Sequence, residues 1–338
     1  MGIPRLKPKE TELFRRSLLI TGLALGAVGF SAPPASSVRV DVLTSAGDAA
    51  AFNERILGWW DITITTPDGP RPSWLEIERS GRDAVVGRIV GIVGSARPIS
   101  RIAANGDSLS FAVPHQWENG DGDLAVAGRL QGDRLAGRMT FPDGKSFDWT
   151  AVRAPRRVSP PTPVWGTPIN LLHANDLGGW KAMGGPNQWV VRNGVLISPH
   201  SGANIVTERT FGDFKLHIEF RYPKESNSGV YLRGRHEVQI QDDYGLEPAD
   251  DRFSGIYGFI SPSEMAAKPP GQWQTFDITL VGRMVTVVAN GKRVICNQEI
   301  PGITGGALDS NEGAPGPLYL QGDHGPVEFR NIVLTPAS

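Results

Sequence analysis

The sequence predicts an all-β protein, with a small antiparallel β-barrel or sandwich domain followed by a larger jelly-roll sandwich. Short runs of alternating apolar and polar residues, the period of a half-buried strand, recur along most of the chain. Turn-forming pairs such as Asp68-Gly69 and Asn290-Gly291 separate many of these runs. The 41 Gly and 27 Pro fit an all-β chain with frequent turns, because apolar runs fill the spaces between them.

The N-terminus has the pattern of an export signal, which we place at residues 1–36. Basic residues, including the pair Arg15-Arg16, precede an apolar stretch over residues 17–30, and small residues and prolines follow. This order is typical of a secretory signal, and the two arginines allow twin-arginine export. The stretch is too short and too rich in Gly and Ala for a comfortable membrane span, although a retained anchor is an alternative. We therefore expect a periplasmic or extracellular protein with no membrane span in the mature chain.

The first domain is predicted over residues 58–153, after a stretch with some helical character at residues 38–57. Its expected strands are residues 60–64, 74–78, 84–90, 108–111, 124–126, 134–137 and 147–150. Strands of this length at near-even spacing favour a small antiparallel barrel or sandwich. We expect Trp60, Trp74 and Trp117 to fill its core, with the lining of a ligand cup as the alternative. No motif assigns this domain a role.

A stiff Pro-rich linker is predicted over residues 154–164, and a second domain over residues 165–338. Its expected strands are residues 214–220, 230–232, 237–241, 284–289, 293–296, 317–321 and 327–334. The length and the antiparallel strand content fit a concanavalin-like jelly-roll sandwich. Two curved sheets in such a fold give a concave polar face where sugars bind.

The charge balance argues against nucleic-acid binding, and the cysteine content excludes a disulfide and a cysteine-rich metal site. The chain has 34 Lys+Arg against 35 Asp+Glu, so it lacks the basic excess that a nucleic-acid binder uses to neutralise phosphates. Cys296 is the only cysteine, which excludes an intramolecular disulfide and a cysteine-rich metal site. Because Cys296 lies in an apolar strand, we expect it to be a buried residue without a catalytic role.

Residues 227–244 are the part of the chain richest in candidate site residues. Strand alternation places Glu237, Gln239 and Gln241 on one face, about 6.6–7 Å apart between successive members. A carboxylate beside amides suits sugar hydroxyls, which need both donors and acceptors. A solvent-facing polar side of a strand is the alternative interpretation. The neighbouring charges of Arg233 and Asp242 favour a functional site.

The second domain resembles the 3-keto-disaccharide hydrolase family over residues 165–336. The motifs that carry this resemblance, in order, are residues 227–234, 237–245, 254–258, 271–275, 290–291, 320–325 and 329–332. No single motif is specific, but together and in this order they are. The resemblance does not extend to the first domain.

The resemblance implies action on glycosides whose 3-hydroxyl has been oxidised to a ketone. The carbonyl acidifies the C2 proton, so a base forms an enolate, the anomeric group leaves by elimination, and water adds to the enone. Such chemistry needs a base, a donor for the leaving oxygen and a group that stabilises the enolate. Glu237 and His324 are our candidates for the acid and base. The enolate would be stabilised by Arg233 or by a calcium or magnesium ion.

Further site residues are expected around this pair. Asp242 and Asp243 are the candidate ligands of such a cation, with an Asx turn at a strand end as an equally good interpretation. Substrate contacts are expected from Asn227, Arg233, Gln239, Tyr257, Trp273 and Gln321. For Trp273, a place in the core is an equally good interpretation.

Ordinary retaining glycosidases place two carboxyl groups about 5–5.5 Å apart. In this chain the strand instead alternates Glu237, Gln239 and Gln241, and glutamine cannot act as a nucleophile. The sequence therefore disfavours double displacement and leaves elimination, or binding without cleavage, as in a carbohydrate-binding module. A third alternative is an extracellular interaction protein in which the first domain binds a partner. The sequence does not indicate the oligomeric state.

Overall fold

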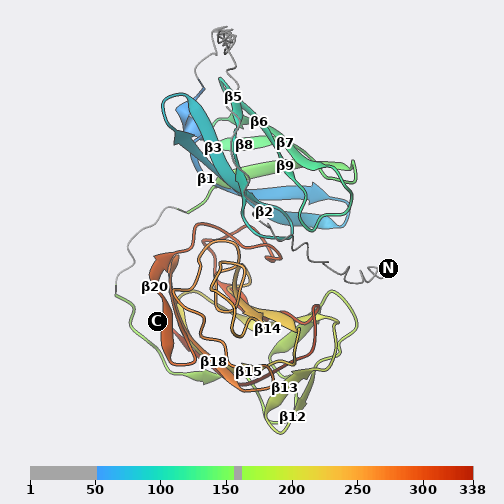
Figure 1. Cartoon of the computed structure of the whole chain (residues 1–338), viewed down its shortest axis with the longest axis vertical. Coiled ribbons are helices and arrows are strands. Elements are labelled where there is room, and N and C mark those ends of the chain that lie inside the picture. Colours follow the sequence, from blue (N-terminus) through green and yellow to red (C-terminus); the bar gives the residue numbers. More distant parts are fainter. Residues whose placement is uncertain (1–51, 156–161, 338) are drawn as a thin grey trace, which may run out of the picture. The chain divides into compact units, whose positions relative to one another are not determined.

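The structure is a computed structural model that describes residues 52–155 and 162–337, and its described part is almost entirely β (Figure 1). This confirms the all-β fold class. The predicted export signal and most of the stretch at 38–57 lie outside the described residues. The described end of that stretch is a single 3-10 turn, Glu54–Ile56. No helix of residues 52–155 and 162–337 is long and apolar enough to cross a membrane.

The N-terminal strands form one nine-stranded antiparallel sheet in the order β4-β3-β2-β1-β9-β8-β7-β6-β5. Their bounds are β1 Gly58–Thr66, β2 Gly69–Ser80, β3 Ala84–Val90, β4 Arg97–Ile99, β5 Ala103–Asn105, β6 Ser108–Pro114, β7 Asp123–Gln131, β8 Arg134–Thr140 and β9 Ser146–Arg153. One cluster of buried side chains, including Trp60 and Trp149, collects residues from most of these strands. A single sheet can share one core in this way only by curling around it, as in a barrel.

The remaining strands form two sheets. One has the order β12-β13-β22-β15-β18-β19-β20 with β10 paired to β22, and the other has the order β11-β14-β21-β16-β17. Their bounds are β10 Ile169–Asn170, β11 Trp180–Met183, β12 Val190–Arg192, β13 Val195–Ser198, β14 Asn204–Phe211, β15 Phe214–Arg221, β16 Asn227–Leu232, β17 His236–Gln241, β18 Gln274–Val281, β19 Met284–Ala289, β20 Lys292–Glu299, β21 Gly316–Leu320 and β22 Val327–Pro336.

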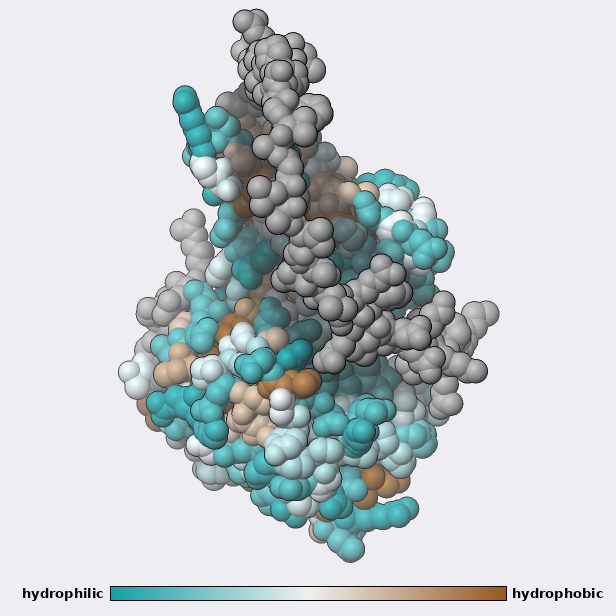
Figure 2. Space-filling view, in the orientation of Figure 1, coloured by the Kyte–Doolittle hydropathy of each residue, from teal (hydrophilic) through white to brown (hydrophobic). Residues whose placement is uncertain are grey.

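The two sheets share one hydrophobic core, to which alternate residues of both contribute. In β15, for example, Phe214, Leu216, Ile218 and Phe220 are buried, and the residues between them are more exposed. On the face shown in Figure 2, hydrophilic residues cover most of the sandwich and apolar residues are confined to small patches. The period-2 pattern of the sequence thus produces a sandwich with an apolar interior and, on the face shown, a largely polar surface.

Two expectations about single residues were wrong. Cys296 is exposed, because the pairing of β19 with β20 is irregular near Val287 and the adjacent residues Val294 and Ile295 are both buried. Strict alternation would have placed Cys296 inside. Trp60 lies in the core of the N-terminal sheet as expected, whereas Trp74 is buried in a separate cluster with Ile303 and Ala307, and Trp117 is 69% exposed.

Phe220 lies at the centre of the sandwich core, and its ring centroid is 4.6 Å from that of Phe276 and 6.1 Å from that of Phe253. We predict that Phe220→Ala lowers the free energy of unfolding by about 3–5 kcal/mol, because it removes apolar contacts and leaves a cavity. Urea unfolding followed by circular dichroism measures this. Val190→Ala, at a residue that is 37% exposed, is the control and should change stability by less than about 0.5 kcal/mol. Equal effects of the two substitutions would contradict the assigned core.

Candidate active site

The candidate site lies on the outer face of the five-stranded sheet, where strand register aligns polar side chains in rows. Tyr231 of β16 pairs with Tyr319 of β21 on one side and with Glu237 of β17 on the other. In the next row, Gly229 of β16 pairs with Gln239 and its carbonyl accepts a hydrogen bond from the backbone N–H of Gln321, 3.0 Å. Side chains on alternate positions of a strand share a face, so these two rows form one surface.

Glu237 is buried among polar groups rather than in apolar packing. Its side chain is almost inaccessible, and the Tyr231 hydroxyl donates a hydrogen bond to Glu237 Oε2 over 2.9 Å. The same hydroxyl lies 3.0 Å from the carbonyl oxygen of Gly305. The carboxylate leans over Gly229, where it occupies the position that a Cβ would take. Any side chain at residue 229 would therefore displace the carboxylate.

Burial raises the pKa of Glu237 to about 8, although the Tyr231 hydrogen bond and the charge of His324 act in the opposite direction. The hydrogen-bond arrangement also suits a protonated Glu237. The Tyr231 hydroxyl has one proton but faces two acceptors, Glu237 and the Gly305 carbonyl. A protonated Glu237 can donate to the Tyr231 oxygen, while Tyr231 donates to Gly305.

Asp323 and His324 form a dyad within electrostatic range of Glu237. His324 Nδ1 lies 2.6 Å from Asp323 Oδ1, and this hydrogen bond is the main cause that raises the pKa of His324. Burial opposes the ionisation of Asp323, but hydrogen bonds from His324 and Asn204 hold its pKa below the usual range. A histidine whose Nδ1–H points at a carboxylate presents Nε2 for proton transfer. Both side chains of the dyad are about half exposed.

Two further tyrosines border Glu237. The ring of Tyr319 stacks on that of Tyr231, with centroids 4.3 Å apart and planes at 15°. The backbone N–H of Tyr257 donates to the Glu237 carbonyl over 3.1 Å, and burial together with the charge of Glu237 raises the pKa of the Tyr257 phenol. Burial also raises the pKa of Tyr319, so both phenols remain protonated hydrogen-bond donors.

Buried acceptor atoms without partners lie on the same face. Within the described residues, the Oε1 atoms of Gln239 and Gln321 are buried and have no hydrogen-bond partner. A buried, unsatisfied polar atom costs about 1–3 kcal/mol.

Half of the chain, including the candidate site, matches a known protein family. The family described as 3-keto-alpha-glucoside-1,2-lyase-like domain matches residues 167–335. The chain belongs to this family. The match confirms the resemblance that the sequence motifs indicate, and it contains every residue of the two rows and the dyad. The nine-stranded N-terminal sheet lies outside it.

Several solved structures are similar to the sandwich. A protein of Parabacteroides distasonis, named only provisionally as a glycosyl hydrolase, is 29% identical, with 54% of this chain and 93% of that chain covered and a TM-score of 0.42. A second such protein of the same organism is 24% identical, with coverage of 50% and 98% and a TM-score of 0.41. The carbohydrate binding module CBM66 of Bacillus subtilis is 13% identical, with coverage of 46% and 93% and a TM-score of 0.31. No curated protein matches the chain.

The structure brings together most of the residues that the sequence indicates. Gln239 and Gln321 lie in the row next to that of Glu237. The backbone of Tyr257 contacts that of Glu237, and His324 is within electrostatic range of Glu237. Asn227 extends the same face, where its amide donates to Gln241 Oε1 over 3.1 Å.

Arg233 lies apart from this group. It sits in the turn between β16 and β17 with a positive φ of 52°, and its Nη2 donates to the Gly282 carbonyl over 2.7 Å. Burial lowers the pKa of Arg233 to about 10, and the charge of Asp213 partly compensates. The guanidinium therefore joins this turn to the opposite sheet, and its contacts do not favour a role at the substrate.

Trp273 lies on the other sheet, just before β18. The guanidinium groups of Arg330 and Arg221 lie over its ring, 3.9 Å and 4.8 Å from the centroid. Glu219 and Glu328 pair with these two arginines. The indole is thus engaged by cations on the eight-stranded sheet, and this position does not favour sugar stacking.

Asp242 and Asp243 accept hydrogen bonds from the protein itself. Asp242 Oδ2 accepts from the backbone N–H of Glu225, and the two oxygens of Asp243 accept from Gln241 and from the backbone N–H of Phe253. In residues 52–155 and 162–337, no group of three or more His, Cys, Asp or Glu side chains could hold a metal ion. This arrangement fits loop-fixing carboxylates better than cation ligands.

Sequence reasoning missed Tyr231, Tyr319 and Asp323 as site residues. A signal for Tyr231 was present, because a short turn between residues 231 and 237 places these two residues opposite each other in a hairpin. Tyr319 joins through long-range pairing of β21 with β16, which no local pattern shows.

The raised pKa of Glu237 predicts a pH-dependent stability. In an unfolded chain its pKa is near 4.5, so the folded state holds the proton more tightly and stability falls as the pH rises from about 4.5 to about 8. Glu237→Gln removes this loss. We expect the variant to melt several degrees above the wild type at pH 9, at about 2–4 °C per kcal/mol, and at the same temperature near pH 4.

Glu219→Gln is the matched control with the opposite sign. Burial alone would raise the pKa of Glu219, but hydrogen bonds from Asn331 and Arg330 outweigh it and lower this pKa. Its replacement should reduce stability at neutral pH, and the difference should disappear in acid. If the melting temperatures of the wild type and Glu237→Gln differ by the same amount at every pH, the pKa of Glu237 is not raised in the folded state.

Proposed function

We propose that the sandwich cleaves glycosides that carry a ketone at C3, by removal of the C2 proton, elimination of the anomeric group and rehydration. The observation that carries this proposal is the pairing of a buried carboxyl group whose pKa is raised with an Asp–His dyad on one sheet face. Elimination needs an acid and a base that coexist at one pH, and groups with shifted pKa values provide this. We also propose that the protein is exported.

His324 serves as the base in this proposal. Its Nε2 takes the proton from C2, and the negative charge moves to the ketone oxygen. Asp323 stabilises the imidazolium that forms, since it holds Nδ1–H at 2.6 Å. A protonated phenol such as that of Tyr319 can hydrogen-bond the enolate oxygen.

Glu237 serves as the acid, because at neutral pH its raised pKa keeps it protonated. It gives its proton to the glycosidic oxygen as the C1–O bond breaks, which leaves an enone. Water then adds at C1, Glu237 takes a proton from this water, and His324 returns its proton to C2. The net reaction is hydrolysis, and both groups regain their starting states.

The direct test uses a 3-keto-glucoside with a chromogenic aglycone, and the parent glucoside as the control substrate. We expect aglycone release from the keto compound alone, and a loss of roughly 10²–10⁴-fold in kcat for Glu237→Gln or His324→Gln. A chelator arm tests the cation at Asp242 and Asp243, which the proposed steps do not use. Binding of the keto compound with no release would instead indicate a carbohydrate-binding module.

The pH profile separates the two roles. Activity should rise with pH as His324 loses its proton and fall again above about 8 as Glu237 loses its own. Asp323→Asn removes the main cause that raises the pKa of His324, so the acidic limb should move to lower pH. An acidic limb that stays in place would show that His324 is not the base.

A further inference from the structure

The nine-stranded domain lies outside the family match, yet its loops contact Gly305 and Gly306, which lie beside the Tyr231–Glu237 pair. The backbone N–H of Gly306 donates to the carbonyl of Ile92 over 3.1 Å. A Cβ at residue 305 would collide with the backbone of Gly94. Gly305 is also the residue whose carbonyl faces the Tyr231 hydroxyl. A chain of contacts therefore leads from this domain through Gly305 to Tyr231 and Glu237.

Apolar packing fixes these loops in place. Trp74 of β2 is fully buried in a cluster with Val90, Ile303 and Ala307. Its ring meets Phe259 edge-on, with centroids 5.2 Å apart. The buried indole also fills the space beside Gly302, where a Cβ would not fit. The contact is therefore close-packed, like a protein interior.

Trp117 is held exposed by a rigid loop. Among the described residues it is the only exposed tryptophan, although its neighbours are firmly anchored. Glu118 is buried, forms an ion pair with Arg97 at 2.5 Å, and accepts a hydrogen bond from the backbone N–H of Gln116 over 2.9 Å. The Gln116 amide oxygen accepts in turn from the backbone N–H of Ser95 over 2.9 Å. An indole that a fixed loop holds in water is a preorganised contact surface.

The Trp117 side chain is directed to the candidate active site. A Cβ at Gly94 would meet the Trp117 ring, and the backbone of Gly94 packs against Gly305. The Trp117 side chain also lowers the pKa of the Tyr257 phenol, against the larger effects of burial and of the charge of Glu237. Trp117 thus stands one side chain beyond the residues that border the acid. Because other side chains lie between Trp117 and the acid, its aromatic face suits a sugar unit next to the reacting ring better than the reacting ring itself.

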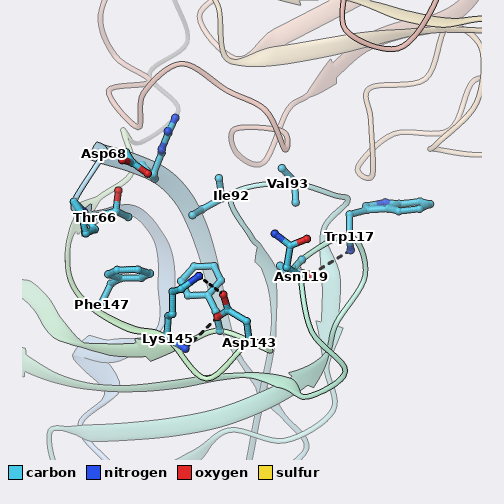
Figure 3. Close-up of a pocket in the computed structure, with 13 residues that line it drawn as sticks. Thr66, Asp68, Ile92, Val93, Trp117, Asn119, Asp143, Lys145 and Phe147 are labelled. Atoms are coloured by element: carbon cyan, nitrogen blue, oxygen red, sulfur yellow. Dashed lines mark hydrogen bonds and ion pairs between the residues drawn. The ribbon is translucent and has the colours of Figure 1, made fainter. Parts of the chain in front are cut away.

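A pocket of about 440 Å³ adjoins Trp117 and includes Ile92, Phe141, Phe147 and Asn119 in its lining (Figure 3). Figure 3 shows the indole pointing away from Phe147 and Lys145, so that Trp117 forms the border of the pocket rather than its floor. The lining also includes the charged residues Asp68, Arg71 and Asp143, so the pocket offers hydrogen-bond partners for sugar hydroxyls as well as apolar surface.

We propose that Trp117 and this adjoining pocket bind the second unit of the substrate, a sugar ring linked to the 3-keto residue. This inference rests on the proposed function for the reacting ring only. It makes the N-terminal domain the specificity-determining half of the site, because the row of Glu237 and Gln239 contacts one ring and Trp117 contacts the next.

The test measures binding by calorimetry in the Glu237→Gln background, where turnover is blocked. The probes are a methyl 3-keto-glucoside and a 3-keto-disaccharide of glucose. We expect the disaccharide to bind more tightly, and Trp117→Ala to weaken it at least tenfold while the methyl glycoside changes less than twofold. Trp117→Phe should retain part of the preference. Trp165→Ala, which removes an indole that contacts Lys215 of the eight-stranded sheet, should change neither affinity.

Each outcome has a distinct meaning. If Trp117→Ala weakens the binding of both probes equally, Trp117 acts only through Tyr257, and the inference is overturned. Unchanged affinities in Trp117→Ala would overturn it too, as would a Glu237→Gln protein that binds neither probe. The proposed function is tested separately, by measuring whether the wild type cleaves the chromogenic keto-glucoside. A wild type that binds but does not cleave, with the disaccharide preference lost in Trp117→Ala, would overturn the reaction and uphold this second-ring site.

Discussion

The candidate site depends on one hydroxyl proton, that of Tyr231, which faces both Glu237 and the Gly305 carbonyl. One proton cannot serve two acceptors fully, and the conflict is removed when Glu237 carries a proton of its own. Burial favours the same protonated state. The hydrogen bonding and the desolvation therefore act together, and they make a carboxyl group that is neutral at neutral pH without any charged partner in direct contact.

Much of the fold follows from local pattern. Alternation in residues 214–220 and the turn Asn290-Gly291 predict β15 and the β19–β20 hairpin, because each depends on neighbours in sequence. Short strands such as β4 and β12 carry too few residues to show a period. Cys296 was misplaced for a related reason, since the irregular pairing of its strand does not appear in the alternation of residue types.

The site was predictable where one strand or loop carries it and not where separate segments meet. Glu237 and Gln239 share β17, so spacing alone relates these residues. Asp323 directly precedes His324 and could have been named with it for the same reason. Tyr319 and Gly305 reach Glu237 only through long-range pairing and loop placement. Trp273 and Arg233 have suitable residue types, but tertiary contacts with Arg330 and with Gly282 place them elsewhere.

Gly302 and Gly305 each lie where atoms of the nine-stranded sheet and its loops, Trp74 and Gly94, leave no room for a methyl group. Neither glycine has a positive φ, so close packing against this sheet is the steric reason for glycine at both positions. Joining this sandwich to a different N-terminal partner would therefore need a surface shaped to the same two gaps.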